Sequence, residues 1–249
     1  MTCTKDVNHM ANTLYQVSTL QALAQGNYYG NCTIEELLSH GDTGLGTFKD
    51  LNGEMILLDG ICYRADDKGN VSIMGNTEKT PFAVTSFFMP DSTSPISKPM
   101  DLAQLLSTLD EEVSHKGKNN IYLCRFDGLF LKVKARSELA QKEPYRPIAK
   151  AMETDQREFT FKNVEGTLVC VYFPTYMDKL NLAGWHIHFL SKDKSQGGHV
   201  FDLTLMKGHL QWQKISDFQM VIPKNPHFQN LNLSDVSKEE IESVEKSGN

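Results

Sequence analysis

Three of the eight histidines lie close together in the sequence, at a spacing that suits metal binding. His186 and His188 are separated by one residue, and His199 follows a pair of glycines a little further on. In a β-strand, residues two apart point to the same face, so His186 and His188 project side by side. If the segment 199–205 pairs with that strand, His199 can join the same face, because opposed or diagonal Cβ atoms lie roughly 4.5–8 Å apart. Three imidazoles can then converge on one ion.

Three histidines from neighbouring strands would leave one position of a tetrahedral zinc ion open. Structural zinc sites usually fill all four positions with cysteine and histidine, whereas catalytic sites keep one for water or substrate. The five cysteines are scattered and never form a Cys-x-x-Cys pair, so histidine has to supply the ligands. The plainer interpretation is that His186 and His188 are half-buried strand residues and that His199 merely begins a strand. The sequence favours an open, catalytic Zn²⁺ site.

A sheet has to hold these histidines, and short apolar segments predict one. The polar, glycine-ended segment 191–198 is typical of a hairpin loop between the two histidine strands. Asp127-Gly128 and Lys207-Gly208 predict two further hairpin turns. From residue 159 on, the strand spacing indicates a curled sheet or partial barrel. Strands are expected over 121–126, 129–136, 159–162, 166–173, 184–190, 199–205 and 209–215.

The first half of the chain predicts a mixed sheet with helices. Thr33 and Glu36 form a capping box that predicts a short helix. Apolar residues repeat at helical spacing from Leu102 to Val113, which predicts a longer helix ended by Gly117. Strands are expected over 54–59, 71–74 and 81–89.

The fold class is therefore α/β, mixed and β-rich, with two domains. An N-terminal mixed-sheet domain is expected over residues 1–155. A C-terminal, β-rich, zinc-binding domain is expected over residues 156–249, with its tail contributing to the active site. A weak echo between segments 51–56 and 164–169 agrees with two similarly built halves.

Bulk properties narrow the classes of partner. The net charge of −6, with no basic cluster, argues against a nucleic-acid partner. The sequence contains no run of about 18 apolar residues, so no membrane-spanning helix is predicted. The N-terminus lacks the basic start and apolar stretch of a secretory signal, and the odd, scattered cysteines indicate reduced thiols. A cytoplasmic location is expected.

Other residues attract little attention on sequence logic alone. The glycine-dense segment 41–48 lacks the Gly-Lys-Ser/Thr ending of a P-loop and the spacing of a dinucleotide-binding loop. Glu54 begins a predicted strand, and Glu245 lies in a short acidic helix with little to bury. With Arg136, both would pass as ordinary surface charges.

The chain resembles the bacterial acetolactate decarboxylase family, and the matching motifs run along most of its length. They are GDTGLGTF at 41–48, Asp59-Gly60 with Tyr63, Gln141 with Pro144-Tyr145, and above all GWHIHF at 184–189 with GGHV at 197–200.

The resemblance implies roles for residues far apart in the chain. His186, His188 and His199 match the zinc ligands. Arg136 matches the active-site arginine, and Glu54 and Glu245 match the two active-site glutamates, with Glu239, Glu240 and Glu242 as neighbours of the last. Thr47 matches a threonine that lines the same pocket.

The resemblance also implies an activity and an assembly. The family converts 2-acetolactate to (R)-acetoin and CO₂ in acetoin and butanediol biosynthesis, without an organic cofactor. Zn²⁺ would chelate the substrate's carbonyl and hydroxyl oxygens, Arg136 would hold its carboxylate, and Glu54 or Glu245 would transfer the proton. Two α/β domains are implied, with the N-terminal sheet continued across a homodimer.

Two other functions are consistent with a His-x-His strand. A cupin-like metal oxygenase usually places a glutamate a few residues after the pair, and segment 189–193 holds none. A non-catalytic binding module could use zinc only to brace the hairpin, which would require a fourth protein ligand such as Asp202 or His209. The ligand arrangement distinguishes these alternatives.

Overall fold

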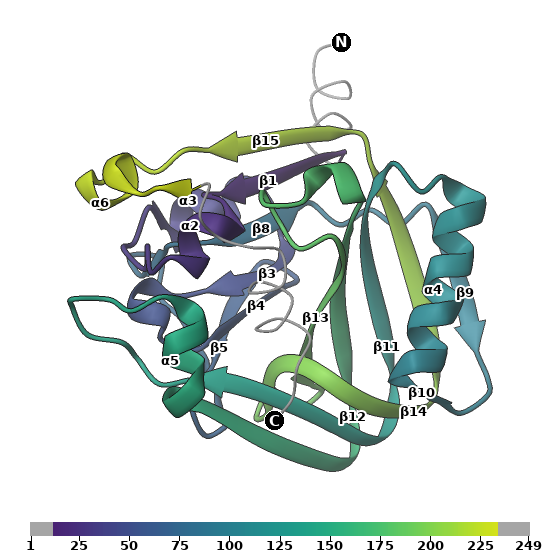
Figure 1. The fold of residues 1–249 in the computed structure, drawn as a ribbon. Coiled ribbons are helices and arrows are strands. Elements are labelled where there is room, and N and C mark those ends of the chain that lie inside the picture. Colours follow the sequence, from purple (N-terminus) through teal and green to yellow (C-terminus); the bar gives the residue numbers. More distant parts are fainter. Residues whose placement is uncertain (1–11, 234–249) are drawn as a thin grey trace.

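Two β-sheets face each other across a shared apolar core in the computed structural model, which describes residues 12–233 (Figure 1). The seven-stranded sheet has the order β15 (Asp217–Val221), β1 (Thr13–Val17), β8 (Ala83–Ser86), β3 (Thr43–Thr47), β4 (Glu54–Leu58), β5 (Ile61–Ala65) and β6 (Val71–Ile73). The six-stranded sheet has the order β10 (Met100–Asp101), β14 (Gly197–Ile215), β11 (Ile121–Glu138), β12 (Gln156–Phe173) and β13 (Gly184–Ser191), with β9 (Ser92–Ile96) beside β14.

Short elements complete the architecture. The helices are α2 (Leu20–Ala24), α3 (Ile34–Leu38), α4 (Leu102–Lys116), α5 (Ile148–Asp155) and α6 (Pro226–Asn230), with 3₁₀ turns at Lys49–Leu51 and Thr175–Met177. A separate pair is formed by β2 (Cys32–Thr33) and β7 (Lys79–Thr80). Among residues 12–233, no helix is both long enough and apolar enough to cross a bilayer.

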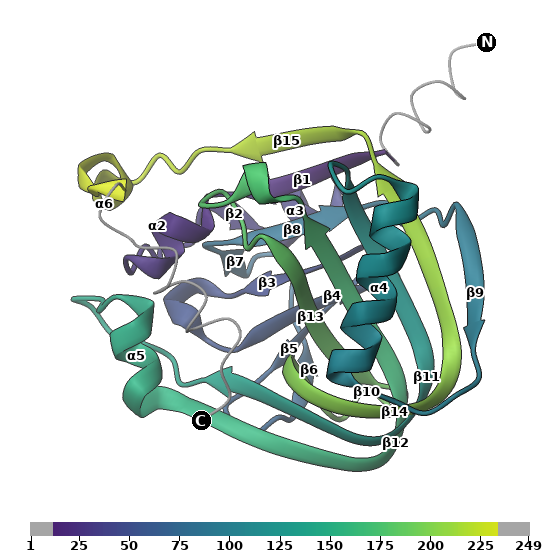
Figure 2. The ribbon, with the colours of Figure 1, turned by 45° about the vertical axis from the view of Figure 1, so that its right-hand side comes forward.

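The six-stranded sheet returns on itself. β14 pairs with β11 along most of its length and with β13 at its first residues, so β14, β11, β12 and β13 form a closed path. Figure 2 shows how strongly these long strands curve. The predicted fold class, a β-rich mixed α/β fold with a curled sheet that carries three histidines, is confirmed.

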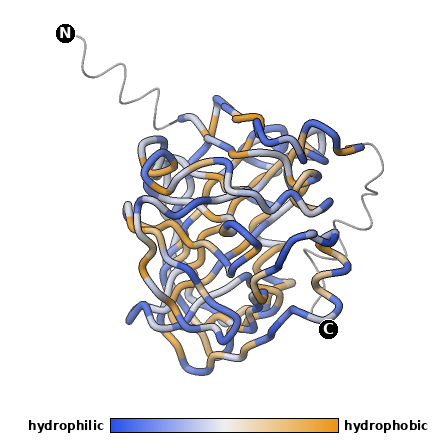
Figure 3. Tube along the Cα trace, turned by 90° about the vertical axis from the view of Figure 1, so that its left-hand side faces the viewer, coloured by the Kyte–Doolittle hydropathy of each residue, from blue (hydrophilic) through white to orange (hydrophobic). Residues whose placement is uncertain are grey.

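The core between the sheets takes side chains from both of them. Leu45 and Ile56 of the first sheet are fully buried with Leu123, Val169 and Val171 of the second. Burying one such side chain contributes about 1.5–3 kcal/mol, so this layer fixes the distance between the sheets. Hydrophilic segments run along much of the outline of the molecule (Figure 3).

Helix α4 covers the opposite face of the second sheet. Leu105, Leu109 and Val113 are buried against it, as their helical spacing predicts. Asp101 forms a capping box with Gln104, with backbone contacts of 2.8 and 3.0 Å. The predicted helix is confirmed, and Gly117 follows it in a left-handed conformation.

The hairpin turns predicted at Asp127-Gly128 and Lys207-Gly208 are wrong, because each pair lies inside one continuous strand. Gly128 of β11 lies directly opposite Gly166 of β12 and Gly208 of β14, so three glycines form a row across the sheet. A Cβ atom on Gly208 would lie 2.4 Å from the Asp127 carbonyl oxygen and 2.5 Å from Cζ of Phe126. These glycines serve close packing inside strands rather than chain reversal.

The predicted domain boundary near residue 155 stays a prediction. Each sheet takes strands from both sides of that residue. β15 lies in the first sheet, whereas β9, β10 and β11 lie in the second.

Replacing Gly208 by Ala should reduce the free energy of unfolding by about 1–3 kcal/mol, because the added methyl group overpacks the glycine row. Gly75→Ala is the matched control, since a Cβ atom there meets nothing within 4 Å. Urea unfolding of both variants checks this. Equal stability of the two variants would contradict the role of the glycine row.

Candidate active site

The three histidines lie on the two strands that close the second sheet. His188 of β13 is directly opposite His199 of β14, and His186 precedes it by two residues on the same face. This register is the one under which the sequence allows His199 to join the same face. On β12, Val171 lies opposite His186 and Val169 opposite His188, and both valines are buried between the sheets. The histidine face consequently points toward the first sheet.

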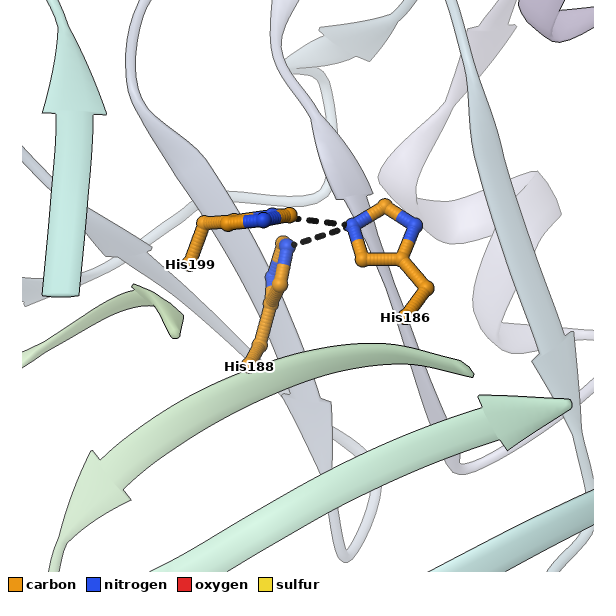
Figure 4. Close-up of side chains that lie close together, drawn as sticks. All are labelled: His186, His188 and His199. Carbon is orange, nitrogen blue, oxygen red and sulfur yellow. Dashed lines mark hydrogen bonds between the residues drawn. The ribbon is translucent and has the colours of Figure 1, made fainter. Parts of the chain in front are cut away.

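The imidazole rings converge on one point (Figure 4). Nε2 of His186 lies 3.1 Å from Nε2 of His188 and 3.1 Å from Nδ1 of His199. The three side chains are almost completely buried, with exposed fractions of 6% for His186, 0% for His188 and 4% for His199. Their candidate ligand atoms all lie within 4.8 Å of one another, which makes them a potential metal-binding group.

The arrangement of these nitrogens fits a divalent metal ion. Zn–N bonds of about 2.0–2.1 Å in tetrahedral geometry separate two nitrogens by about 3.3–3.4 Å, close to the spacing found here. Nδ1 of His188 lies 2.8 Å from the carbonyl oxygen of Met55. With its proton on Nδ1, His188 donates a hydrogen bond to that oxygen and keeps Nε2 available as a ligand, and backbone carbonyls commonly orient zinc-binding histidines in this way.

Burial favours the neutral form of His186 and His188, which metal binding requires. Burial lowers the pKa of His186 to about 3, and the positive charge of Arg136 acts in the same direction. Burial also lowers the pKa of His188 well below its usual value, helped by His186, while the Met55 carbonyl opposes the shift. Neutral imidazoles offer a lone pair to a metal at neutral pH.

Glu54 reaches the histidines from the first sheet. It begins β4 and is 7% exposed, and its Oε2 lies 3.3 Å from Nε2 of His188. Thr47 lies opposite Glu54 on β3, and its hydroxyl donates to the Gly53 carbonyl at 2.9 Å. This bond ties together the strand ends that position the carboxylate.

Arg136 reaches the site from β11 through an irregularity in the strand. It lies opposite His199 and is only 2% exposed. The buried residues of β11 that pack on the α4 side are even-numbered up to Phe130 and odd-numbered from Val133, and the pairing with β14 shifts between Phe130 and Lys132. A β-bulge re-aims the following side chains. Without that shift Arg136 would point away from the histidines.

One cavity brings most of the predicted site residues together. Its apolar wall comes from α2, α5 and the segments near β3, and its polar wall from the strands. The polar lining is Thr47, Glu54, Arg136, Glu138, His186 and His199, and the apolar lining includes Leu20, Leu23, Leu51, Phe82, Ile148 and Met152.

Sequence reasoning missed Glu138 and the apolar wall. Glu138 is 5% exposed and follows Arg136 by two residues, so both project to the same side of β11. The predicted strand ended at Arg136, which hid this alternation. If the predicted strand had continued past Arg136, the two-residue spacing would have indicated Glu138 as a neighbour of Arg136 on the same face.

Glu245 is outside the described residues. The two alternative fourth ligands, Asp202 and His209, lie away from the three histidines. Asp202 is paired with Lys132 at 2.7 Å, and His209 lies opposite Asp127 further along β14. The structure therefore brings neither alternative fourth ligand into the three-histidine group.

Comparison with known proteins extends this picture. The family model for alpha-acetolactate decarboxylase matches residues 14–235. Alpha-acetolactate decarboxylases of Brevibacillus brevis and Methanosarcina mazei are 37% and 39% identical, over 94% and 96% of this chain and 81% and 82% of theirs. The crystal structure of alpha-acetolactate decarboxylase from Bacillus subtilis strain 168 has a TM-score of 0.90 and 34% identity, covering 94% of this chain and 100% of that one.

These similarities extend over nearly all of the described chain and include the strands that carry the histidines. They confirm the family resemblance drawn from the sequence motifs and the enzyme class, a decarboxylase. The chain belongs to the alpha-acetolactate decarboxylase family.

Proposed function

We propose that the protein converts 2-acetolactate to (R)-acetoin and CO₂, using Zn²⁺ held by His186, His188 and His199. The observation that carries the proposal is the convergence of three buried imidazoles beside Glu54 and Arg136. The names of the relatives support the substrate. Zn²⁺ held by these histidines would supply Lewis-acid chemistry toward the oxygen atoms of the substrate.

Arg136 holds the substrate carboxylate. Its guanidinium presents a planar fork that matches a carboxylate with two parallel hydrogen bonds, which also fixes the direction of the C–C bond that breaks. Because the side chain is 2% exposed, water competes little for this interaction. The position opposite His199 places the charge beside the proposed metal ligands.

A carboxyl group completes the reaction by proton transfer. Loss of CO₂ from a 2-hydroxy-3-oxo acid leaves an enediolate, which has to receive a proton on one face to give a single enantiomer. Glu54 is fixed at the start of β4 and lies within reach of the histidines, so it is a candidate donor. Glu245, the second candidate, belongs to the proposal through the family resemblance alone.

The other cavity residues orient the substrate. The Thr47 hydroxyl already donates to Gly53, and its oxygen can still accept a hydrogen bond from a substrate hydroxyl. Leu20, Leu23 and Met152 provide an apolar surface for the methyl groups of 2-acetolactate. An apolar wall also limits water in the site, which strengthens the electrostatic interactions there.

Location and assembly are part of the proposal. Cys32, Cys62, Cys124 and Cys170 are free and buried, and reduced thiols are typical of proteins in the cytoplasm, so these residues support a cytoplasmic location.

Ile73 on the edge strand β6 is 70% exposed, which supports continuation of the first sheet across a homodimer. Light scattering should give twice the chain mass, and a single-chain mass would refute the dimer.

Replacing His199 by Ala should remove bound zinc and abolish acetoin formation from 2-acetolactate. Two histidines alone bind the ion too weakly to compete with water and buffer molecules for it. His115→Ala, on the outer helix α4, is the control and should keep both properties. Metal analysis and an acetoin assay on the two variants check this. Normal zinc content in His199→Ala would remove that residue from the site.

Arg136→Lys should reduce kcat/KM roughly ten- to hundredfold, because losing one charge-assisted hydrogen bond costs about 1.5–3 kcal/mol. Zinc content should stay unchanged. Arg157→Lys, on the exposed side of neighbouring β12, should behave as wild type. Unaltered kcat/KM in Arg136→Lys would argue against a bidentate contact with the substrate.

Stability of the metal-free protein should fall as pH drops below about 6.5. The pKa of His186 is near 3 when folded and near 6.5 when unfolded, so the unfolded chain binds more protons in this window. The contribution of neutral, buried His186 to the free energy of unfolding is fully present above about pH 6.5 and is lost as pH falls toward 3. Urea unfolding at pH 5 and pH 7 should show a smaller difference in His186→Gln, and an equal or larger one would contradict this origin.

A further inference from the structure

A second cleft lies apart from the histidine cavity and shares no lining residue with it. Its volume is about 750 Å³, which is within the usual range for small-molecule sites. Strands β11, β12 and β14 line it at their glycine row, together with the connection between β13 and β14. The polar side chains at the cleft include Arg125, Asp127, Thr167, Lys192, Lys194 and Lys207.

Two of the cations in the cleft already have carboxylate partners. Arg125 lies between Asp59 and Asp127, at 2.7 and 2.8 Å. Asp127 also accepts a hydrogen bond from the Thr167 hydroxyl at 2.6 Å. Lys192 forms an ion pair of 2.8 Å with Glu165 of β12. Arg125 and Lys192 are therefore already compensated by carboxylates.

Lys194 and Lys207 differ from them, since neither forms an ion pair within residues 12–233. Nζ of Lys194 lies 5.7 Å from the centre of the Tyr63 ring. Burial lowers the pKa of Lys194, the positive charge of Arg125 adds to that shift, and the negative charges of Asp59, Asp127 and Asp193 oppose it. Burial thus disfavours the charged ammonium, and an anion bound in the cleft would favour it.

The chain presents Lys194 on a well-ordered connection. The Ser191 hydroxyl donates to Asp193 at 2.6 Å and accepts from the backbone N–H groups of Ser195 and Gln196 at 3.1 and 2.9 Å. Lys194 itself has φ of 62° and donates its backbone N–H to the Ser191 carbonyl at 3.0 Å. A site built on such a connection loses little entropy when it binds a ligand.

We propose that this cleft binds a small anion through a carboxylate or phosphate group held between Lys194 and Lys207. The cleft lining has four Arg and Lys side chains against the carboxylates of Asp127 and Glu165, so it attracts anions more strongly than the rest of a protein whose net charge is −6.

Calorimetric titration of the full-length, zinc-loaded protein tests the proposal, with inorganic phosphate and malonate as probes and ionic strength held constant with sodium chloride. We expect one saturable site per chain for at least one probe. Which probe binds distinguishes a phosphate ligand from a carboxylate ligand. The double variant Lys194→Gln/Lys207→Gln should bind at least tenfold more weakly.

Lys118→Gln/Lys224→Gln makes the same change of charge at exposed positions that do not line the cleft and should bind within twofold of wild type. Equal weakening in both double variants, or no saturable binding of either probe, would overturn the proposal. Unchanged affinity of the cleft variant would do so as well.

Chemical labelling of the wild-type protein provides a test that does not depend on the folding of a variant. The bound probe should protect Lys194 from an amine-reactive reagent, measured by peptide mass spectrometry, while Lys224 labels at an unchanged rate. Equal labelling of Lys194 with and without the probe would also count against the site.

Discussion

The direct pairing of His188 with His199 across β13 and β14 is the constraint on which the site depends. It places two imidazoles side by side, and the two-residue period of β13 adds His186 to the same face. The same pairing closes the path of β14, β11, β12 and β13, so the metal-binding group and the curled sheet have one structural origin. A one-residue slip in this register would turn His199 to the other face.

The two sheets contribute different parts of the site. The second sheet supplies the histidines and Arg136, whereas the first supplies Glu54 and the Met55 carbonyl that orients His188. The apolar core between them holds these groups at bonding distance. A site divided in this way is sensitive to the packing of both sheets, although its central group lies on one hairpin.

The sequence was most informative where a local period determines the structure. The spacing of the histidines predicted their common face, and the apolar period of α4 predicted its buried side. The hairpins predicted at Gly128 and Gly208 were wrong because a glycine marks a close approach as readily as a turn. Packing against Phe126, which is a tertiary contact, decides between the two.

Long-range geometry explains the rest of what was missed. A register shift near Phe130 decides which face of β11 carries the Arg136 side chain, and no local pattern of charges reveals that shift. The family resemblance singled out Arg136 and Glu54 without that geometry. Glu138 was overlooked because the strand was predicted to end too early, so its alternation with Arg136 was not visible.

Restoring activity with metal tests the central claim most directly. The purified protein is stripped with a chelator, Zn²⁺ is added back in steps, and acetoin formation from 2-acetolactate is followed at each step. The three-histidine site predicts no turnover in the metal-free protein and a linear recovery that ends at one Zn²⁺ per chain. Full turnover in protein shown to be metal-free would contradict the account.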